Sequence, residues 1–477
     1  MDMPATANSN ASKTTAVTKT NADLVVEMLQ RVGVQRLFGM PGGGSNADVI
    51  EAAARAGLPF SLAQTETGSA FMAIAQAEIT GMPGACISTI GPGAASVMNG
   101  VAHANLECVP LIVVTDCQPT TADQVVQHQT IRQGEMLTPL VKRTEKPTAK
   151  DAAPALERVF DSALALPPGP VHLDLSSEVT SATAQIELMF KKPSSPFFAR
   201  THLSGEVQAS LRGAQRPVFL IGLGARTVTI SEAIRAQCSA GGIPALVTYK
   251  AKGVVPDRNS WFAGVLTNGA LERDILEQAD VFIAIGLDPT ELMRPWSFPQ
   301  PLISITAWPL ERRQIPGAIE LVGDVVSILH DVVASLPKTL WDEGDIQRSA
   351  GAQRERMRPF PKGPLLQPNR VVELVAETYP GARITVDAGA HMFPVMSLWP
   401  AEEPCEILIS NCLATMGFAL PAAIGASPLD PSRPLVAFTG DGGLLMCLGE
   451  LRTAARENLP LRVIVFDDRE LSLIRIK

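Results

Sequence analysis

Two acidic turns near the C-terminal end of the 477-residue sequence have the residue types of a metal–phosphate site. Gly440-Asp441-Gly442 follows one short apolar run, and Asp467-Asp468 follows the next. In a parallel strand–helix–strand unit both turns lie at the carboxyl edge of the sheet, where open α/β sheets bind ligands. Carboxylates suit Mg²⁺, and glycines let backbone amides approach an anion. The pattern predicts a Mg²⁺–diphosphate site. A plain tight turn is the alternative for Gly-Asp-Gly taken alone.

The first third of the chain adds glycine-rich turns and one carboxylate at expected strand ends. The loop from Gly39 to Ser45 has no lysine after its glycines, so it indicates the backbone wall of a small-molecule pocket rather than a Walker loop. Gly91-Pro-Gly93 follows another expected strand. Glu66 lies between an expected strand and a helix whose face is otherwise Ala, Met and Ile. We expect a carboxylate at a buried junction; the alternative is a water-exposed residue at a helix start.

Strands and helices alternate along the sequence, which predicts α/β folding with doubly wound parallel sheets. We expect three such domains, the third incomplete where the sequence stops. Expected boundaries are a disordered tail at 1–20, domains at 21–185, 197–338 and 365–477, and linkers at 180–200 and 349–367. Expected strands are 34–38, 85–89, 111–115, 171–175, 218–221, 245–247, 281–285, 302–306, 383–386, 435–438 and 461–466; expected helices include 21–34 with Asn21 as cap, 151–165, 418–426 and 444–457.

Composition narrows the class of protein. Hydrophobic residues make up 46% and charged residues 18%, and the formal net charge is −8. No long basic block occurs, which argues against nucleic acid or an acidic membrane surface as partner. The seven cysteines are scattered without a C-x-x-C pair, which is typical of thiols in a reducing compartment. The uncharged stretches 79–106 and 407–429 contain Gly, Pro and Asn, so we expect buried core rather than membrane spans, in a cytoplasmic protein.

Together these motifs resemble those of the thiamin diphosphate-dependent enzymes, most closely the large subunit of acetohydroxyacid (acetolactate) synthase and the 2-oxo acid decarboxylases. Thr65-Glu66-Thr-Gly68 falls on the family's His-Glu-x-Gly, Gly91-Pro-Gly93 on its Gly-Pro-Gly, and the two acidic turns on its diphosphate motif. The resemblance covers residues 21–477. It implies a pyrimidine-binding, a middle and a diphosphate-binding domain, a 2-oxo acid substrate, and a homodimer or homotetramer with active sites at the subunit interface.

The resemblance also implies residue roles. Glu66 would bond to a ring nitrogen of the aminopyrimidine, Met416 would support the bent cofactor, and Gln129 and His128 would line the substrate pocket as further catalytic residues. Cofactor-binding positions would be Gly42, Gly91, Gly389, His391, Thr415, Met416, Gly440, Gly442 and Gly443, and Mg²⁺ ligands would be Asp441, Asp468 and a backbone carbonyl near Glu470.

Several positions depart from the family pattern. Asp467-Asp468 stands where the family usually has Asn-Asn. His128 stands in place of a Phe, and Ser177 stands in place of a Lys. Lys477 stands in place of the Trp that selects the acceptor substrate. These departures leave two alternatives open: a non-ligating decarboxylase of aromatic or branched-chain 2-oxo acids, and an inactive cofactor-binding subunit or regulator. In the middle domain, 286–291 lacks the family's flavin-side Arg-Phe-Asp-Asp-Arg, so FAD is not expected.

Overall fold

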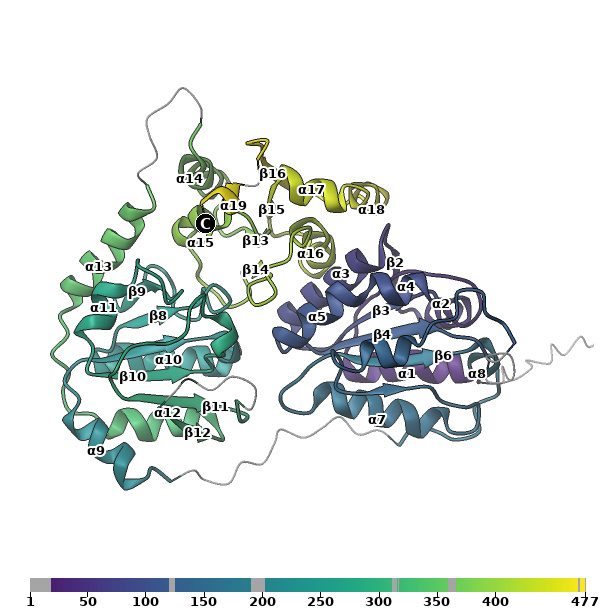
Figure 1. The fold of residues 1–477 in the computed structure, drawn as a ribbon, viewed down its shortest axis with the longest axis horizontal. Coiled ribbons are helices and arrows are strands. Elements are labelled where there is room, and N and C mark those ends of the chain that lie inside the picture. Colours follow the sequence, from purple (N-terminus) through teal and green to yellow (C-terminus); the bar gives the residue numbers. More distant parts are fainter. Residues whose placement is uncertain are drawn as a thin grey trace, which may run out of the picture.

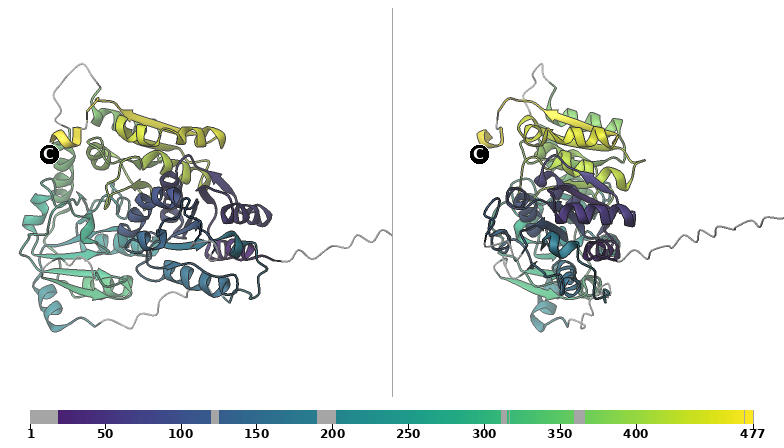
Figure 2. Two further views of the ribbon diagram at one scale, coloured as in Figure 1. Left: turned by 45° about the vertical axis from the view of Figure 1, so that its right-hand side comes forward. Right: turned by 90° about the vertical axis from the view of Figure 1, so that its right-hand side faces the viewer.

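The computed structural model describes residues 19–119, 125–189, 202–310, 315, 317–358, 366–470 and 472–476. Its strands form three parallel sheets of six, six and four strands, which confirms the predicted fold class. The first and second sheets lie side by side, and the third lies above both (Figure 1). The turned views of Figure 2 keep the third sheet on that side of the other two. Most of the expected tail, residues 1–18, and residues 190–200 of the first linker lie outside the described residues.

The first sheet has the strand order β2-β1-β3-β4-β6-β5. Its elements are α1 Asn21–Val32, β1 Leu37–Met40, α2 Ser45–Ala56, β2 Phe60–Leu62, α3 Glu66–Thr80, β3 Gly84–Ser88, α4 Pro92–Ser96, α5 Met98–Leu106, β4 Leu111–Asp116, α6 Gln133–Leu137, β5 Thr144–Glu145, α7 Ala152–Leu164, β6 Val171–Leu175 and α8 Ser177–Thr180. The cap of α1 is Thr20, in a capping box with Asp23. The prediction that Asn21 caps this helix was wrong, because its buried amide instead donates to the carbonyls of Ala149 and Val179.

The second sheet has the order β12-β11-β10-β7-β8-β9. Its elements are α9 Gly205–Gly213, β7 Pro217–Ile221, η1 Leu223–Ala225, α10 Val228–Gly241, β8 Ala245–Val247, β9 Phe262–Val265, α11 Arg273–Gln278, β10 Val281–Ile285, η2 Pro289–Glu291, β11 Leu302–Thr306, β12 Ala318–Val322, α12 Val325–Ala334 and α13 Glu343–Arg356. Helix α13 extends through residues 349–356 of the expected linker 349–367, so that part of the prediction was wrong. The helix is stabilised by its Asp342 cap and by the burial of Ile346 and Gln353, which the polar sequence hides.

The third sheet has the order β14-β13-β15-β16. Its elements are α14 Pro368–Thr378, β13 Arg383–Val386, α15 Met392–Leu398, β14 Ile407–Ile409, α16 Ala419–Ala426, η3 Ser427–Leu429, β15 Leu435–Gly440, α17 Asp441–Cys447, α18 Glu450–Arg456, β16 Leu461–Phe466 and α19 Ser472–Ile476. The single helix predicted at 444–457 is two helices, because the chain bends at Leu448 and Gly449 between α17 and α18.

The first and third domains share one hydrophobic core. Helix α3 is buried between its own sheet and α16 of the third domain, and the core joins Phe71 and Ile74 to Phe418 and Ile424. A methyl group on Gly425 would lie 2.2 Å from the backbone oxygen of Met72, so the two helices are in direct backbone contact there. This contact matters for function, because α3 begins at Glu66 and α16 begins three residues after Met416.

Candidate functional site

The acidic turns and the segment around His391 meet at the carboxyl edge of the third sheet. From β13 the chain passes to β14 on one side and then to β15 on the other, so the crevice between β13 and β15 is a topological switch point. Gly389 and His391 follow β13, and Gly440 ends β15. Gly440 pairs in register with Phe466, the last residue of β16, so the two acidic turns begin side by side as the sequence predicts.

His391 lies at this switch point with an unused polar atom. The residue is 7% exposed, and its Nε2 has no hydrogen-bond partner among the described residues. Its ring stacks on Phe466 with centroids 5.3 Å apart. Burial lowers the pKa of His391 to about 4, so the ring is neutral at neutral pH. A methyl group on Gly389 would lie 2.6 Å from this ring, and one on Gly440 would lie 3.6 Å from it. We call Gly389, His391 and Gly440 the cradle.

The acidic side chains beside the cradle are accessible and locally held. Oδ1 of Asp441 accepts from the backbone N–H of Gly442 at 2.8 Å. Oδ1 of Asp468 accepts from the N–H of Glu470 at 3.1 Å, and its other oxygen accepts from Ser472. The carboxylate of Glu470 forms an ion pair with Arg475, so only its backbone remains for the predicted role.

The loop that carries Met416 is fixed from two sides. The hydroxyl of Thr415 accepts from the Asn99 amide of the first domain at 3.0 Å. Buried Asp387 accepts from the N–H groups of Phe418 and Ala419 at 2.6 and 2.9 Å, and from the Thr439 hydroxyl at 2.6 Å. Asp387 therefore joins the ends of β13 and β15 to the start of α16.

The first domain brings Glu66 and two glycine turns together at the carboxyl edge of its own sheet. Gly42 follows β1 and Gly91 follows β3. The chain passes from β1 to β2 on one side and then to β3 on the other, so a topological switch point lies between these two parallel strands. A methyl group on Gly93 would lie 3.2 Å from Oε1 of Glu66. Glu66 is the first residue of α3 and is half-buried rather than buried as expected. Among the described residues no hydrogen bond or ion pair engages its carboxylate, which leaves both oxygens free for a ligand.

Buried polar groups support the glycine turns. The N–H of Gly91 donates to Oε1 of Gln133, whose amide donates to Asp174 at 2.7 Å. Burial raises the pKa of Asp174 to about 6. The backbone of Gln129 lies against Gly91 with a φ of 59°, and the side chains of Gln129 and His128 are exposed at the same edge.

Glu450 anchors the candidate site in a way that the sequence did not indicate. This buried residue begins α18, and its carboxylate accepts from the N–H groups of Gln64 and Thr65 at 3.0–3.2 Å. The third domain thereby fixes the start of α3, and with it Glu66. A single Glu at the start of a short helix gives no sign of its partner in sequence. Asp387 and Gln133 were missed as anchors for the same reason.

In the middle domain a glutamate side chain occupies the topological switch point of the sheet. The chain adds β8 and β9 on one side of β7 and then β10 on the other, so the switch point lies between β7 and β10. Gly222 and Gly286 lie in backbone contact there. Buried Glu291 places its carboxylate there. It accepts from the N–H of Leu223 at 2.9 Å and from the Thr248 hydroxyl at 2.5 Å. A carboxylate thus takes the amide that a dinucleotide phosphate would use in such a fold.

The structure places the predicted site residues in two groups on two sheet edges. Gly389, His391, Gly440 and the acidic turns form one group, and Glu66, Gly42, Gly91 and Gln129 form the other. Within the described part of one chain, no hydrogen bond links the Glu66 carboxylate to the cradle. Across those same described ranges, no helix is both long and apolar enough to cross a membrane.

Comparison with known proteins agrees with this division. Three models of the thiamine pyrophosphate enzymes match: the N-terminal TPP binding domain at residues 19–136, the central domain at 205–332 and the C-terminal TPP binding domain at 387–477. The chain is 29% identical to the acetolactate synthase isozyme 1 large subunit of Escherichia coli, over 97% of this chain and 84% of that protein.

Two further relatives show the same range of similarity. The catabolic acetolactate synthase of Raoultella terrigena is 29% identical over 96% of this chain and 84% of its own length. The acetolactate synthase of Bacillus subtilis is 29% identical over 95% of this chain and 82% of its own length. With all three domain models in sequence order on the three sheets, the chain belongs to the thiamine pyrophosphate enzyme family.

Proposed function

We propose that the protein catalyses thiamin diphosphate- and Mg²⁺-dependent decarboxylation of a 2-oxo acid, followed by carboligation in the manner of an acetolactate synthase. The observation that carries the proposal is the cradle. Here a buried imidazole nitrogen that has no partner among the described residues lies beside two glycines, at a switch point next to two acidic turns. A buried polar atom without a partner is costly, and a diphosphate oxygen would satisfy Nε2 in the form of the ring that carries its proton on that atom. The chain fits the cofactor on this ground, and the relatives named acetolactate synthase suggest the reaction.

Each part of the cofactor has residues suited to it. His391 and the backbone at Gly440, Gly442 and Gly443 would hold the diphosphate, and Asp441, Asp468 and the Glu470 carbonyl would hold Mg²⁺. Met416 would hold the cofactor in its bent shape. Bound thiamin diphosphate would supply a thiazolium ring as the electron sink for the electron pair left when the 2-oxo acid loses CO₂.

Glu66 would hold and release a proton at a ring nitrogen of the aminopyrimidine. Its carboxylate has no competing partner among the described residues, and Gly93 leaves space beside it. Glu450 and the Thr65 cap fix the first turn of α3, so the backbone that carries Glu66 is in place before the cofactor arrives. Preorganisation of this kind is what general acid–base catalysis requires.

The exposed Asp468 carboxylate should make cofactor binding strongly dependent on Mg²⁺. An aspartate beside a diphosphate adds a negative charge that the cation must offset, whereas asparagine keeps the oxygen without the charge. We expect Asp468→Asn to need about threefold to tenfold less Mg²⁺ for half-maximal binding of thiamin diphosphate. A Mg²⁺ titration followed by protein fluorescence measures this.

Asp467→Asn is the matched control for that titration. It removes the same charge one residue away, at a side chain that is not assigned to the metal, and should shift the midpoint less. Equal midpoints for wild type and Asp468→Asn would remove Asp468 from the metal site.

We propose that the active enzyme is at least a homodimer, with Glu66 of one subunit facing the cradle of another. Helix α17, which follows the cradle, exposes Leu445 at 71% and Met446 at 61%, and the bend after it exposes Leu448 at 45%. Apolar side chains grouped this closely are typical of an interface.

A charge in this face should separate the subunits. We expect Leu445→Glu to sediment as a monomer and to lose activity, because the two halves of the site would no longer meet. Val228→Glu is the control: Val228 is 69% exposed on α10 of the middle domain and should leave the assembly unchanged. A wild-type protein that is monomeric and active would contradict the shared site.

We also propose that the middle domain holds no FAD, since the Glu291 carboxylate already accepts from the N–H of Leu223. The purified protein should be colourless. Burial raises the pKa of Glu291 from 4.5 to about 8, although its hydrogen-bond donors oppose this.

Glu291 predicts a pH dependence of stability. The folded state holds the proton between about pH 4.5 and 8 while the unfolded state has lost it, so this contribution to stability falls as pH rises across that window. Glu291→Gln removes the titration. We therefore expect the melting temperature of wild type, relative to this variant, to fall from pH 5 to pH 8. A constant difference between the two proteins would show that Glu291 titrates normally.

A substrate panel tests the proposed reaction. Protein with thiamin diphosphate and Mg²⁺ is assayed for CO₂ release and for coupled product, with pyruvate and with benzoylformate. Release from pyruvate with acetolactate as product supports the proposal. Release without ligation indicates a simple decarboxylase, and cofactor binding without CO₂ release from any oxo acid indicates a regulatory subunit.

A further inference from the structure

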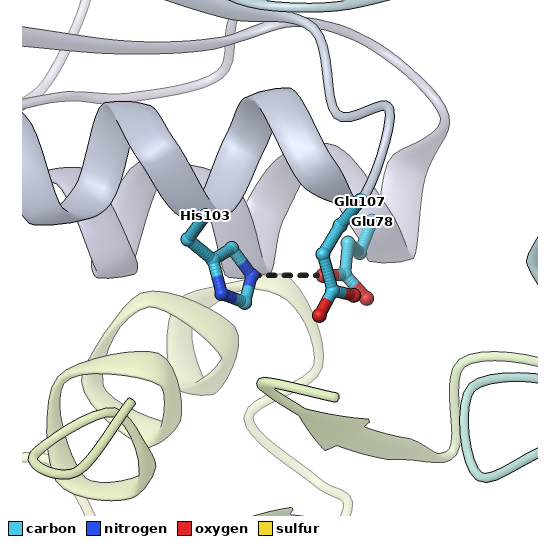
Figure 3. Close-up of side chains that lie close together, drawn as sticks. All are labelled: Glu78, His103 and Glu107. Carbon is cyan, nitrogen blue, oxygen red and sulfur yellow. Dashed lines mark ion pairs between the residues drawn. The ribbon is translucent and has the colours of Figure 1, made fainter. Parts of the chain in front are cut away.

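A buried cluster of charged side chains lies where the three domains meet. It consists of Glu78 at the end of α3, His103 and Glu107 at the end of α5, Arg226 after η1 and Lys250 after β8. The side chains of Glu78, His103, Glu107 and Lys250 are fully buried, and that of Arg226 is 13% exposed. Figure 3 shows His103, Glu78 and Glu107 converging from the two helices of the first domain. None of these residues belongs to the site described above.

Lys250 occupies the centre of the cluster. Its Nζ lies 2.8 Å from both oxygens of Glu78 and 2.6 Å from Oε2 of Glu107. Ligand atoms of Glu78, His103 and Glu107 lie within 4.8 Å of one another, a spacing that suits a metal ion, but the ammonium takes that place. The carboxylates of Glu78 and Glu107 therefore balance the positive charges of Lys250 and Arg226.

The pKa directions agree with a charged cluster. Burial alone would raise the pKa of Glu78, yet Lys250 and Arg226 hold it well below its usual value. Burial alone would lower the pKa of Lys250, yet Glu107 and Glu78 raise it.

The cluster forms hydrogen bonds with the backbone of segment 409–415, which leads directly to Met416. Oε1 of Glu107 accepts from the N–H groups of Asn411 and Cys412 at 2.7 and 2.9 Å. Lys250 donates to the carbonyl of Ile409 at 3.0 Å. Three backbone groups of this segment thus end on charged residues of the other two domains.

A chain of hydrogen bonds connects His103 to Thr415 through the Ser410 hydroxyl. The Ser410 hydroxyl accepts from the N–H of Thr415 at 3.2 Å and lies 2.9 Å from Nδ1 of His103. On the other side of the ring, Nε2 of His103 lies 3.8 Å from Oε1 of Glu78. Phe418 stacks on the imidazole with centroids 5.0 Å apart. The segment is held before and after Met416.

We propose that this cluster is a positioning device for the cofactor site: Lys250, Glu107 and His103 fix the segment 409–415 so that Thr415 and Met416 meet the bent cofactor. Buried ion pairs add little net stability, because desolvation offsets their attraction, but they specify one geometry. The inference rests on the proposed function, since it needs a cofactor that Met416 supports.

Two pairs of variants test the role. Ser410→Ala cuts the link between His103 and Thr415 and leaves the charges intact. Its control is Ser397→Ala, the same change at a buried serine of α15 whose hydroxyl has no partner among the described residues. Lys250→Met removes the central cation. Its control is Lys252→Met, which breaks the buried Lys252–Asp257 pair of the middle domain without touching the segment 409–415.

Each variant is measured for melting temperature, thiamin diphosphate affinity at saturating Mg²⁺, and kcat and KM separately. We expect Ser410→Ala to weaken cofactor binding about tenfold and to lower kcat roughly 10- to 100-fold, with KM within about twofold. Ser397→Ala should match wild type. Lys250→Met and Lys252→Met should lower the melting temperature equally. Lys250→Met should nevertheless lose more thiamin diphosphate affinity than Lys252→Met.

The outcomes separate the two proposals. If wild type binds no thiamin diphosphate, the proposed function fails. If wild type binds it and Ser410→Ala behaves like Ser397→Ala, the positioning role fails while the function stands. Should Lys250→Met not fold, the serine pair still decides.

Discussion

Glu66→Gln is expected to lower kcat by roughly 10²- to 10⁴-fold, the range that a positioned general acid–base group contributes. Glutamine has nearly the same shape, but its amide cannot take up and release a proton at the ring nitrogen. The carboxylate has no other partner among the described residues, so the change breaks no existing hydrogen bond. We therefore expect the melting temperature to stay within about 2 °C of wild type, as for most surface substitutions.

Cofactor affinity separates catalysis from binding in this variant. The cradle lies on another domain, so thiamin diphosphate should bind Glu66→Gln within about tenfold of wild type, the loss expected for one charge-assisted hydrogen bond. Glu51→Gln, at an exposed position of α2 in the same domain, is the matched control and should be fully active. Activity of Glu66→Gln within tenfold of wild type would remove Glu66 from the proton transfer.

Gly425→Ala is expected to destabilise the protein by about 2–3 kcal/mol, the cost of overpacking a tight interface. The added methyl would lie 2.2 Å from a backbone oxygen and 2.6 Å from Cα of Met72, so no side-chain rotation relieves the clash. Helices α3 and α16 must separate, and each carries one end of the proposed site. The melting temperature should fall by roughly 5–10 °C, and kcat should fall with it.

Gly351→Ala gives the opposite sign and serves as the control. Gly351 lies in α13 and a methyl group there meets nothing within 4 Å. Alanine favours the helix by about 0.5–1 kcal/mol over glycine, so the melting temperature should rise slightly. Thermal unfolding followed by circular dichroism measures both variants. If Gly425→Ala left the melting temperature unchanged, α3 and α16 would be able to separate without loss of stability, which would contradict this prediction.

Much of the architecture was predictable because the strands are short apolar runs. The residues 171–175, 245–247, 281–285, 302–306, 383–386 and 461–466 are strands with the predicted bounds. Parallel sheets bury both faces of a strand, which makes such runs conspicuous in sequence. β12, Ala318–Val322, escaped prediction because it is a half-buried edge strand with a Glu at its centre. α13 escaped because its exposed face is densely charged.

The site divides in the same way. The acidic turns and glycines were predictable, because the carboxyl ends of neighbouring parallel strands must meet, and Gly440 does pair with Phe466. The supporting residues were not, since their partners lie far away in sequence. Glu107 reaches Asn411 across 304 positions, and Glu450 reaches Gln64 across 386. No local pattern encodes a pairing of that range.

The shared core of α3 and α16 bears on how the protein comes to be folded. Gln76 of α3 donates to the carbonyl of Gly425, 349 positions further along the chain. A ribosome therefore releases α3, with its apolar face uncovered, long before the helix that covers it exists. Contacts of such range slow folding, and surfaces left waiting for them promote aggregation. An isolated first domain would be poorly soluble, and yield in the cell would depend on how well α3 is shielded until synthesis reaches α16.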